Sequence, residues 1–285
     1  MSTKNNEIKP IEYWAGDKII QFTKPLIMAI VNLTPDSFYD GGKYSSIEDV
    51  LFDVEEKIGQ GADIIDIGAA SSRPNSKIIS KEEEWQRLEP ILKGLRKRFP
   101  KVVISIDTYR AAIAKQAALE GADMINDIGG GSLDDQMFDT IAELNLPYIL
   151  MHIQGTPQTM QQDPKYIHLL DEIRNMFRAK VKTLLDMNFH KIILDPGFGF
   201  GKTLENNFTL LKGLKEFTSL GFPVLAGISR KGMINQVIGT SPVTALTGTT
   251  VLHTIALLNG ASLLRVHDVK EARQAIQLVQ FYENA

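Results

Sequence analysis

Short apolar runs of strand length recur along the chain, and longer segments with apolar residues at helical spacing separate them. Most runs do not alternate with polar residues, which favours strands buried on both faces of a parallel sheet. The expected strands are Leu26–Val31, Ile64–Ile67, Val102–Ile106, Met124–Ile125, Tyr148–Leu150, Ile192–Leu194, Val224–Ile228 and Ser262–Val266.

The segments between these runs predict helices. The first, Ser46–Gln60, opens on a serine followed by acidic residues, a combination that satisfies the free amides of a helix N-terminus. The other expected helices are Glu82–Arg98, Arg110–Leu119, Leu133–Leu144, Tyr166–Met187, Asn207–Phe217, Val243–Leu258 and Val269–Tyr282. Strands that alternate with helices in this way predict either a closed barrel or a doubly wound sheet.

An internal sequence repeat, called the internal echo below, favours one of these two architectures. The run GADIIDIG at Gly61–Gly68 returns as GADMINDIG at Gly121–Gly129, and more faintly as GASLLRV at Gly260–Val266. In each run a glycine follows a helix, where a left-handed residue is favoured, and a strand begins at once. Repeated units of one strand and one helix favour a (β/α)₈ TIM barrel over an open sheet.

The segment before the first of these strands has a different pattern. Ile11–Thr23 has β-prone residues on both sides of a turn at Ala15–Asp17, which predicts a short β-hairpin. We therefore expect an N-terminal extension with a hairpin over residues 1–24, followed by one barrel domain over residues 25–285. A chain of 285 residues is an ordinary length for such a barrel.

Composition and charge restrict the partners. With 31 basic and 34 acidic residues, the net charge of −3 offers no basic field for nucleic acid or an anionic membrane. Positive charge for an anionic substrate must then be local. The chain has no cysteine, which excludes disulfides and thiolate chemistry and fits a reducing cytoplasm. Its most apolar stretch, Val251–Val266, is too short to span a bilayer, so we expect a soluble, cytoplasmic protein.

Polar residues follow nearly every expected strand. In a barrel these positions share the C-terminal rim, where active sites lie. For one residue a polar strand end is the ordinary interpretation, but the same pattern on seven strands favours a functional site. The residues are Asn32, Asp107, Asn126, His152, Asp195, Ser229, Lys231, Arg265 and His267.

The residue types indicate what such a site would hold. Asp107, Asn126 and Asp195 offer acceptors that suit a ligand edge rich in N–H groups, such as a guanidine-like edge on a fused ring. Two carboxylates also suit a glycosidase, although Asn126 between them favours edge recognition. Arg265 and His267 stand at alternate positions at the end of one strand, so both side chains can face the same side, and an arginine offers a planar fork for phosphate oxygens.

A glycine-rich loop, GFGFGKT at Gly197–Thr203, invites comparison with nucleotide-binding loops. The P-loop pattern requires a glycine where this chain has Pro196, so we reject that interpretation. We expect a tight loop whose Phe198 and Phe200 wall an aromatic ligand. A second run, Gly129–Gly131, is interpreted as a flexible turn.

Eight segments between Pro25 and Val269 carry a further signal. They are IMAIVNLTPDSFYDGG at Ile27–Gly42, GADIIDIGAASSRP at Gly61–Pro74, SIDTYR at Ser105–Arg110, GADMINDIGGG at Gly121–Gly131, MHIQGTPQTMQ at Met151–Gln161, ILDPGFGFGK at Ile193–Lys202, GISRKGMI at Gly227–Ile234 and LRVHDV at Leu264–Val269. In order and spacing, these segments resemble the dihydropteroate synthase family. The resemblance implies a (β/α)₈ transferase of folate biosynthesis that condenses (7,8-dihydropterin-6-yl)methyl diphosphate with 4-aminobenzoate and releases diphosphate.

The resemblance also implies roles for individual residues. Asn32 would bind a Mg²⁺ ion that meets the diphosphate. Asp36 and Arg73 lie in two polar loops, Thr34–Gly42 and Ser71–Asn75, that we expect to become ordered after diphosphate binds. Asp36, Lys231, Arg265 and His267 would take part in catalysis. The expected substrate contacts are Asp107, Asn126, Asp195 and Lys231 for the pterin, Ser72, Arg73, Arg265 and His267 for the diphosphate, and Pro74, Phe200 and Ser229 for the aminobenzoate.

The chain departs from the family pattern at one place, because Ala70 stands where the family commonly has glutamate. Two rival functions share the expected pterin pocket. A methyltetrahydrofolate:corrinoid methyltransferase has no need of the diphosphate residues Arg265 and His267, and a pterin carrier without catalysis would lose them too. The resemblance further implies a homodimer, for which Val243–Leu258 is a candidate surface.

Overall fold

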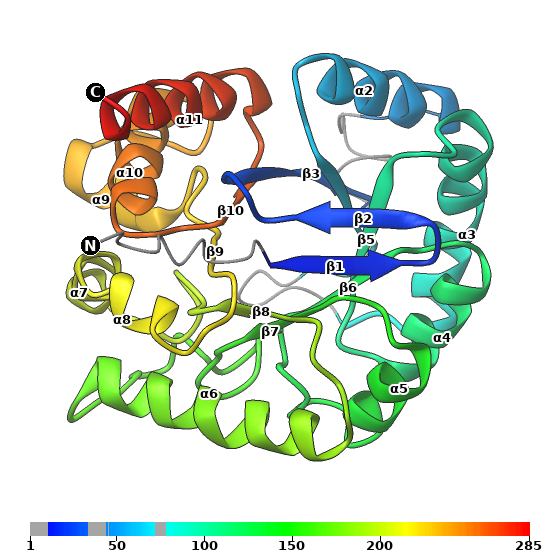
Figure 1. Ribbon diagram of the computed structural model, residues 1–285, viewed down its shortest axis with the longest axis horizontal. Helices are drawn as coiled ribbons and strands as arrows, with labels where there is room; N and C mark the ends of the chain where they lie inside the picture. Colours follow the sequence, from blue (N-terminus) through cyan, green and yellow to red (C-terminus); the bar gives the residue numbers. More distant parts are fainter. Residues whose placement is uncertain (1–10, 34–43, 45, 72–77) are drawn as a thin grey trace, which may run out of the picture.

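The computed structural model describes residues 11–33, 44, 46–71 and 78–285. Eight parallel strands form one sheet in the order β8-β7-β6-β5-β4-β3-β10-β9. A parallel bridge between Leu194 and Val224 joins the two edge strands, and the Leu194 amide donates to the Pro223 carbonyl at 2.9 Å. The sheet thus closes into the expected (β/α)₈ barrel (Figure 1). The strands are β3 (Leu26–Asn32), β4 (Ile64–Gly68), β5 (Val103–Asp107), β6 (Met124–Asp127), β7 (Tyr148–Met151), β8 (Ile192–Asp195), β9 (Leu225–Ala226) and β10 (Leu263–Val266).

Helices surround the barrel on its outer side (Figure 1). Most follow a strand and return the chain to the start of the next one, which is what parallel neighbours require. The helices are α2 (Ile47–Gly59), α3 (Lys81–Arg98), α4 (Ala111–Leu119), α5 (Met137–Leu144), α6 (Leu169–Asp186), α7 (Leu204–Lys212), α8 (Lys215–Thr218), α9 (Gly232–Ile238), α10 (Leu246–Leu258) and α11 (Val269–Glu283).

Three helices differ from the sequence-based expectation. The helix expected over Asn207–Phe217 is broken into α7 and α8 at Gly213, where any added Cβ would overlap the side chain of Leu170 on α6. Helix α5 begins later than expected because Asp134 accepts hydrogen bonds from the amides of Ala111 and Gln136, which fixes a turn before it. The short helix α9 was not predicted.

The barrel interior changes from apolar to polar along each strand. Because side chains alternate across a strand, every second residue points inward. The inward positions near the strand starts form an apolar cluster, and those near the strand ends are polar. The apolar set is Leu26, Met28, Ile64, Val103, Met124, Ile149, Ile193, Leu225 and Leu263, and the polar set that follows it is Asp66, Ser105, Asp107, Asn126, Asp195 and Arg265.

The N-terminal hairpin covers the lower end of this interior. Its strands β1 (Glu12–Ala15) and β2 (Lys18–Gln21) pair antiparallel, which confirms the expected hairpin. The buried side chains of Tyr13 and Ile20 join the apolar cluster, and the Tyr13 hydroxyl donates to the Ile192 carbonyl at 2.7 Å. The hairpin lies across the barrel axis and closes its floor (Figure 1).

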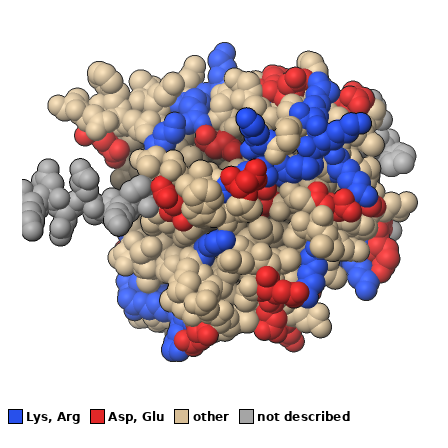
Figure 2. Space-filling model, turned by 45° about the vertical axis from the view of Figure 1, so that its right-hand side comes forward, with Lys and Arg blue, Asp and Glu red and all other residues tan. Residues whose placement is uncertain are grey.

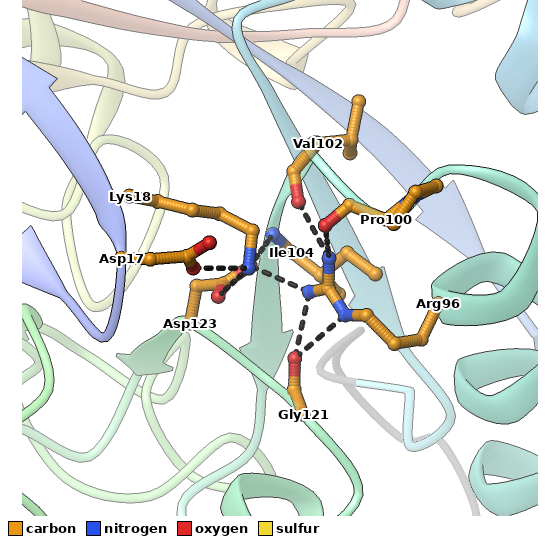
Figure 3. Close-up of polar contacts among 8 residues, drawn as sticks. All are labelled: Asp17, Lys18, Arg96, Pro100, Val102, Ile104, Gly121 and Asp123. Carbon is orange, nitrogen blue, oxygen red and sulfur yellow. Dashed lines mark hydrogen bonds and ion pairs between the residues drawn. The ribbon is translucent and has the colours of Figure 1, made fainter.

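A carboxylate at the start of β6 ties this floor together (Figure 3). Asp123 is 5% exposed and accepts hydrogen bonds from Lys18 of the hairpin at 2.7 Å and from Arg96 of α3 at 2.5 Å. It also accepts the amide of Ile104 at 2.8 Å. Asp123 therefore links the hairpin, a helix and two neighbouring strands.

The repeated sequence Gly-Ala-Asp builds the same arrangement a second time. Asp63 accepts the Ile27 amide at 2.8 Å and Arg273 of α11 at 2.6 Å, and Arg273 also donates to the Gly61 carbonyl. Each copy thus uses an aspartate and an arginine to join a strand start to an outer helix. The internal echo in the sequence therefore corresponds to a repeated set of contacts between a strand start and an outer helix.

The outer surface carries intermixed charges. On the face shown in Figure 2, basic side chains lie close to acidic ones. Ion pairs join neighbouring helices, as between Arg98 and Glu55 at 2.5 Å and between Lys115 and Glu143 at 2.7 Å. Within the described part of the chain, no helix is both long and apolar enough to cross a membrane.

Candidate active site

Four polar side chains meet in the upper half of the barrel interior. Arg265 of β10 donates from Nε to Asp66 at 2.7 Å and from Nη2 to Asp107 at 2.7 Å. Asn126 of β6 donates from Nδ2 to the same Asp66 oxygen at 3.1 Å. The other Asp66 oxygen is buried and accepts no hydrogen bond from the described residues. One cation therefore holds two carboxylates in place below the rim.

Burial and neighbouring charges both shift the pKa values of this cluster. Burial raises the pKa of Asp107 to about 7, although the Arg265 guanidinium opposes that rise and the neighbouring Asp66 carboxylate adds to it. Burial by itself lowers the pKa of Arg265, but Asp66 and Asp107 more than offset it, so the net shift is upward. Arg265 stays charged, and Asp107 is the member of the cluster that titrates near neutral pH.

A second group lies across the barrel at the end of β8. Asp195 is 6% exposed, burial raises its pKa, and the charge of Lys231 opposes that rise. Lys231 donates to the Phe198 carbonyl, and its ammonium lies 4.6 Å from the ring centroid of Phe200. Burial lowers the pKa of Lys231 to about 8, and Asp195 opposes this. The lysine thus connects a buried carboxylate to an aromatic ring at the rim.

The glycine-rich loop after β8 is held from inside by a buried lysine. Lys202 donates to the carbonyls of Gly197 at 2.9 Å and Phe200 at 3.0 Å, and its ammonium lies 3.0 Å from Nδ1 of His152. Gly197, Gly199 and Gly201 all have positive φ, which glycine adopts without strain. This path buries Phe198 completely in the outer core, so the expectation that Phe198 walls a ligand is wrong, whereas Phe200 is half-buried.

A hydroxyl–imidazole pair stands on the loops after β9 and β10. The Ser229 hydroxyl lies 2.9 Å from Nδ1 of His267 and accepts the His267 amide at 3.2 Å. Ser229 is buried and His267 is exposed, so the imidazole faces the mouth of the barrel. The pair places a potential phosphate ligand beside the Arg265 strand.

Asn32, the expected metal ligand, is an exposed residue at the end of β3. Gly68 on the neighbouring strand leaves room beside it, since a Cβ at Gly68 would lie 3.6 Å from Asn32 Oδ1 and 3.5 Å from Asp107 Oδ2. The two oxygens therefore converge over this glycine. Among the described residues, no cluster of three or more His, Cys, Asp or Glu side chains could hold a metal ion.

Four of the expected site residues lie outside the described residues, namely Asp36, Ser72, Arg73 and Pro74. The expected ordering of their two loops lies there as well. The structure does bring the remaining expected residues to one end of one barrel. Their individual roles stay predictions.

Sequence reasoning missed Asp66 and Lys202. Asp66 lies inside an apolar run, and that pattern predicts a buried strand without marking Asp66 as a site residue. The internal echo could have identified Asp66, because Asp66 and Asn126 are each the sixth residue of their repeats. In the structure these two side chains are hydrogen-bonded to each other. Lys202 gave no comparable signal, since its burial depends on the fold of the loop.

Comparison with known proteins agrees with this geometry. Residues 28–267 match the family described as pterin binding enzyme. Dihydropteroate synthase of Haemophilus influenzae is 38% identical over 96% of this chain and all of the relative, and that of Escherichia coli K12 is 40% identical over 95% of this chain and 96% of the relative. The crystal structure of Yersinia pestis dihydropteroate synthase with a sulfonamide drug complex superimposes with a TM-score of 0.91 at 36% identity, covering 96% of this chain and 100% of that chain.

The chain belongs to the dihydropteroate synthase family. Dihydropteroate synthases are transferases of folate synthesis, and the chain is an enzyme of this class. A further relative, from Xanthomonas albilineans, has been solved with 4-aminobenzoic acid and in complex with 7,8-dihydropteroate; the first of these structures has a TM-score of 0.89 at 32% identity over 96% of this chain and 98% of that chain. For a dihydropteroate synthase, the rim that gathers Asp107, Asn126 and Arg265 is the expected place for chemistry.

Pterin binding should depend on pH through Asp107. Lowering the pH through about 7 protonates this carboxyl, which removes an acceptor and weakens its pairing with Arg265. We expect pterin affinity at pH 6 to be roughly tenfold lower than at pH 8, because one pH unit below the pKa leaves about a tenth of the groups ionised. Calorimetric titration across this range measures the change. An affinity that stays constant from pH 6 to 8 would contradict it.

Proposed function

We propose that the barrel mouth binds (7,8-dihydropterin-6-yl)methyl diphosphate and joins it to 4-aminobenzoate. The observation that carries this proposal is the cluster in which Arg265, Asp66, Asp107 and Asn126 converge below the rim. Carboxylates and an amide can accept and donate to the N–H-rich edge of a pterin ring. The solved relatives that hold 4-aminobenzoic acid and 7,8-dihydropteroate support the same two ligands here.

The reaction breaks the bond between the methylene carbon and the diphosphate oxygen, and diphosphate leaves with the electron pair. The amine nitrogen of 4-aminobenzoate then forms the new bond with its lone pair and afterwards loses a proton. Arg265 and His267 stand where they can stabilise the departing anion, and Asp107 and Asp195 can stabilise positive charge on the pterin. An arylamine attacks in its neutral form, so the site needs no strong general base.

Magnesium fits this site as an ion shared with the substrate. Mg²⁺ commonly keeps several waters and binds through one or two protein oxygens together with substrate phosphates. Asn32, with its Oδ1 turned toward the Asp107 side of Gly68, would hold it. When bound, Mg²⁺ supplies positive charge that assists departure of the diphosphate. Diphosphate binding in the presence and absence of Mg²⁺ tests this, and Asn32→Ala should reduce the difference.

The decisive experiment measures diphosphate release with both substrates present. A dihydropteroate synthase forms dihydropteroate and diphosphate in equal amounts. A corrinoid methyltransferase would instead transfer a methyl group without releasing diphosphate, and a pterin carrier would bind its ligand and release none. Failure to release diphosphate would overturn the proposed reaction.

Asp195→Asn should weaken pterin binding and lower turnover while the fold stays intact. The substitution keeps the shape of the side chain but removes a charge that faces Lys231. Loss of one charge-assisted partner in a desolvated site costs roughly 1.5–3 kcal/mol, which is about ten- to 100-fold in affinity. Calorimetry with the pterin and steady-state turnover measure the two effects. Wild-type values for both would make Asp195 a structural residue.

The homodimer stays a proposal, and the structure offers one surface for it. Helices α10 and α11 pack against each other and expose apolar side chains, of which Val251, Ile255 and Phe281 are 53%, 38% and 79% exposed. Exposed apolar residues that gather on neighbouring helices are typical of an interface. Sedimentation of Ile255→Glu tests this, with Leu119→Glu on α4 as the control, because Leu119 is 85% exposed away from this surface. A wild-type dimer in the Ile255→Glu variant would contradict the assigned surface.

We also propose a cytoplasmic location. The cysteine-free sequence is compatible with a reducing compartment. Cell fractionation followed by detection of the protein tests this.

A further inference from the structure

Arg230 occupies a backbone position that normally favours glycine. The Lys231 amide donates to the Ile228 carbonyl at 3.2 Å, which closes a four-residue turn with Arg230 as its third residue. Arg230 has φ 57°, in the left-handed region that turns of this kind usually assign to glycine or asparagine. A side chain kept at a strained position indicates that the side chain itself has a role.

The Arg230 side chain binds two other segments, the loop after β10 and the turn before α10. Its Nε and Nη2 donate to the two oxygens of Asp268 at 2.8 and 2.6 Å, a bidentate pair with fixed geometry. Its Nη1 donates to the carbonyls of Pro242 at 2.6 Å and Val243 at 3.0 Å, just before α10.

The Arg230 backbone adds a contact to α10, because its amide donates to the buried Thr249 hydroxyl at 3.0 Å. Arg230 thus joins the loop after β9 to the loop after β10 and to the start of α10.

The loop after β9 needs such support because its strand is short. Strand β9 comprises only Leu225 and Ala226, which pair with β10, and contact with β8 is a single bridge at Val224. Few sheet hydrogen bonds therefore fix the direction in which the chain leaves β9. The side chains that depend on this direction are Ser229, which pairs with His267, and Lys231, which faces Asp195.

We propose that Arg230 is a positioning residue, whose clamp on Asp268 and the 242–243 carbonyls aligns Ser229, Lys231 and His267 for the transferase reaction. This inference rests on the proposed assignment of those three residues to the site. In this role Arg230 acts through the residues it aligns and not through contact with the substrate. Its effect on the reaction arises through the angle between the loops after β9 and β10.

Arg230→Gly separates the clamp from the backbone turn. Glycine adopts the left-handed conformation freely, so the turn and the fold remain, while every side-chain hydrogen bond of the clamp is lost. We expect kcat/KM for the pterin diphosphate to fall between about tenfold and 100-fold, the size of effect that small misplacements in a site produce. Free guanidinium at non-denaturing concentration should restore part of the activity by binding between Asp268 and the carbonyls. Asp268→Asn should show a smaller loss in the same direction.

Arg273→Met provides a matched control at the barrel floor, where Arg273 clamps Asp63 and the Gly61 carbonyl in the same manner. It should lower thermal stability and leave kcat/KM unchanged. A folded Arg230→Gly variant with wild-type kcat/KM, or with a loss that guanidinium does not relieve, overturns the inference. Ser229→Ala and Lys231→Met separate the two proposals, because wild-type turnover in both would show that the assigned site, and not the clamp alone, is wrong.

Discussion

Replacing Arg265 by methionine should reduce kcat/KM for the pterin diphosphate by roughly 100- to 1000-fold, the range found when a preorganised stabilising group is removed from an active site. Methionine fills a similar volume but carries no charge. Arg265 pairs with Asp66 and Asp107, so its removal leaves a buried and a partly buried carboxylate side by side. Such a pair is expected to share one proton, and the protonated oxygen can then no longer accept a hydrogen bond from the pterin.

Binding of two ligands distinguishes the roles of Arg265. The pterin alcohol should bind more weakly to Arg265→Met because the carboxylates below the rim are no longer held. The pterin diphosphate should lose about tenfold more, because it also loses a charge-assisted partner for its phosphates. Calorimetry with both ligands measures the difference, with Arg265→Lys as the control that retains charge without the fork. Equal losses for the two ligands would show that Arg265 acts on the ring pocket alone.

Asp123→Ala should destabilise the protein by about 3 kcal/mol without affecting catalysis in the folded enzyme. The substitution leaves Lys18 and Arg96 facing one another, removes the acceptor for the Ile104 amide, and opens a small cavity (Figure 3). Breaking a buried ion pair typically costs 3–5 kcal/mol, and the partial exposure of Lys18 and Arg96 places this site at the lower end of that range. The midpoint of thermal unfolding should fall by roughly 6–12 °C.

Asp17→Ala is the matched control for Asp123→Ala. Asp17 lies 3.9 Å from the same lysine but is 95% exposed, so its removal should leave the unfolding midpoint unchanged. Thermal denaturation of both variants, together with kcat/KM at a temperature where each is folded, measures the contrast. A large fall in kcat/KM for folded Asp123→Ala would show that the floor and the rim are energetically coupled.

The sequence predicted the barrel and its catalytic end because both depend on local patterns. Apolar runs followed by polar residues place Asp107, Asn126 and Asp195 at strand ends, and parallel strands bring those ends together. The pairing of Arg265 with Asp66 cannot be predicted from local patterns, since it depends on which residues of different strands lie at the same height in the barrel interior. The internal echo carried part of that information, because it aligns Asp66 with Asn126.

Loop conformation was harder to predict than strand position. The two phenylalanines of the loop after β8 are chemically alike, but three left-handed glycines turn Phe198 into the outer core and leave Phe200 near Lys231. The glycine at the break before α8 likewise reflects a neighbour distant in sequence, because Leu170 occupies the space that a side chain at Gly213 would need. Such outcomes depend on packing that no short window of sequence contains.

The hairpin across the barrel floor affects how ligands enter and leave the site. The apolar cluster fills the lower interior, and Tyr13 and Ile20 pack against it from below, so within the described part of the barrel substrates and products share the upper mouth. The ligand bound deepest must then enter before its co-substrate, and it must wait for whatever lies above it to depart. In the proposed binding mode, with the pterin ring at the Asp107–Asn126 cluster, dihydropteroate withdraws its pterin end last. In a barrel with a closed floor, the order in which the ligands bind therefore determines the order in which the products leave.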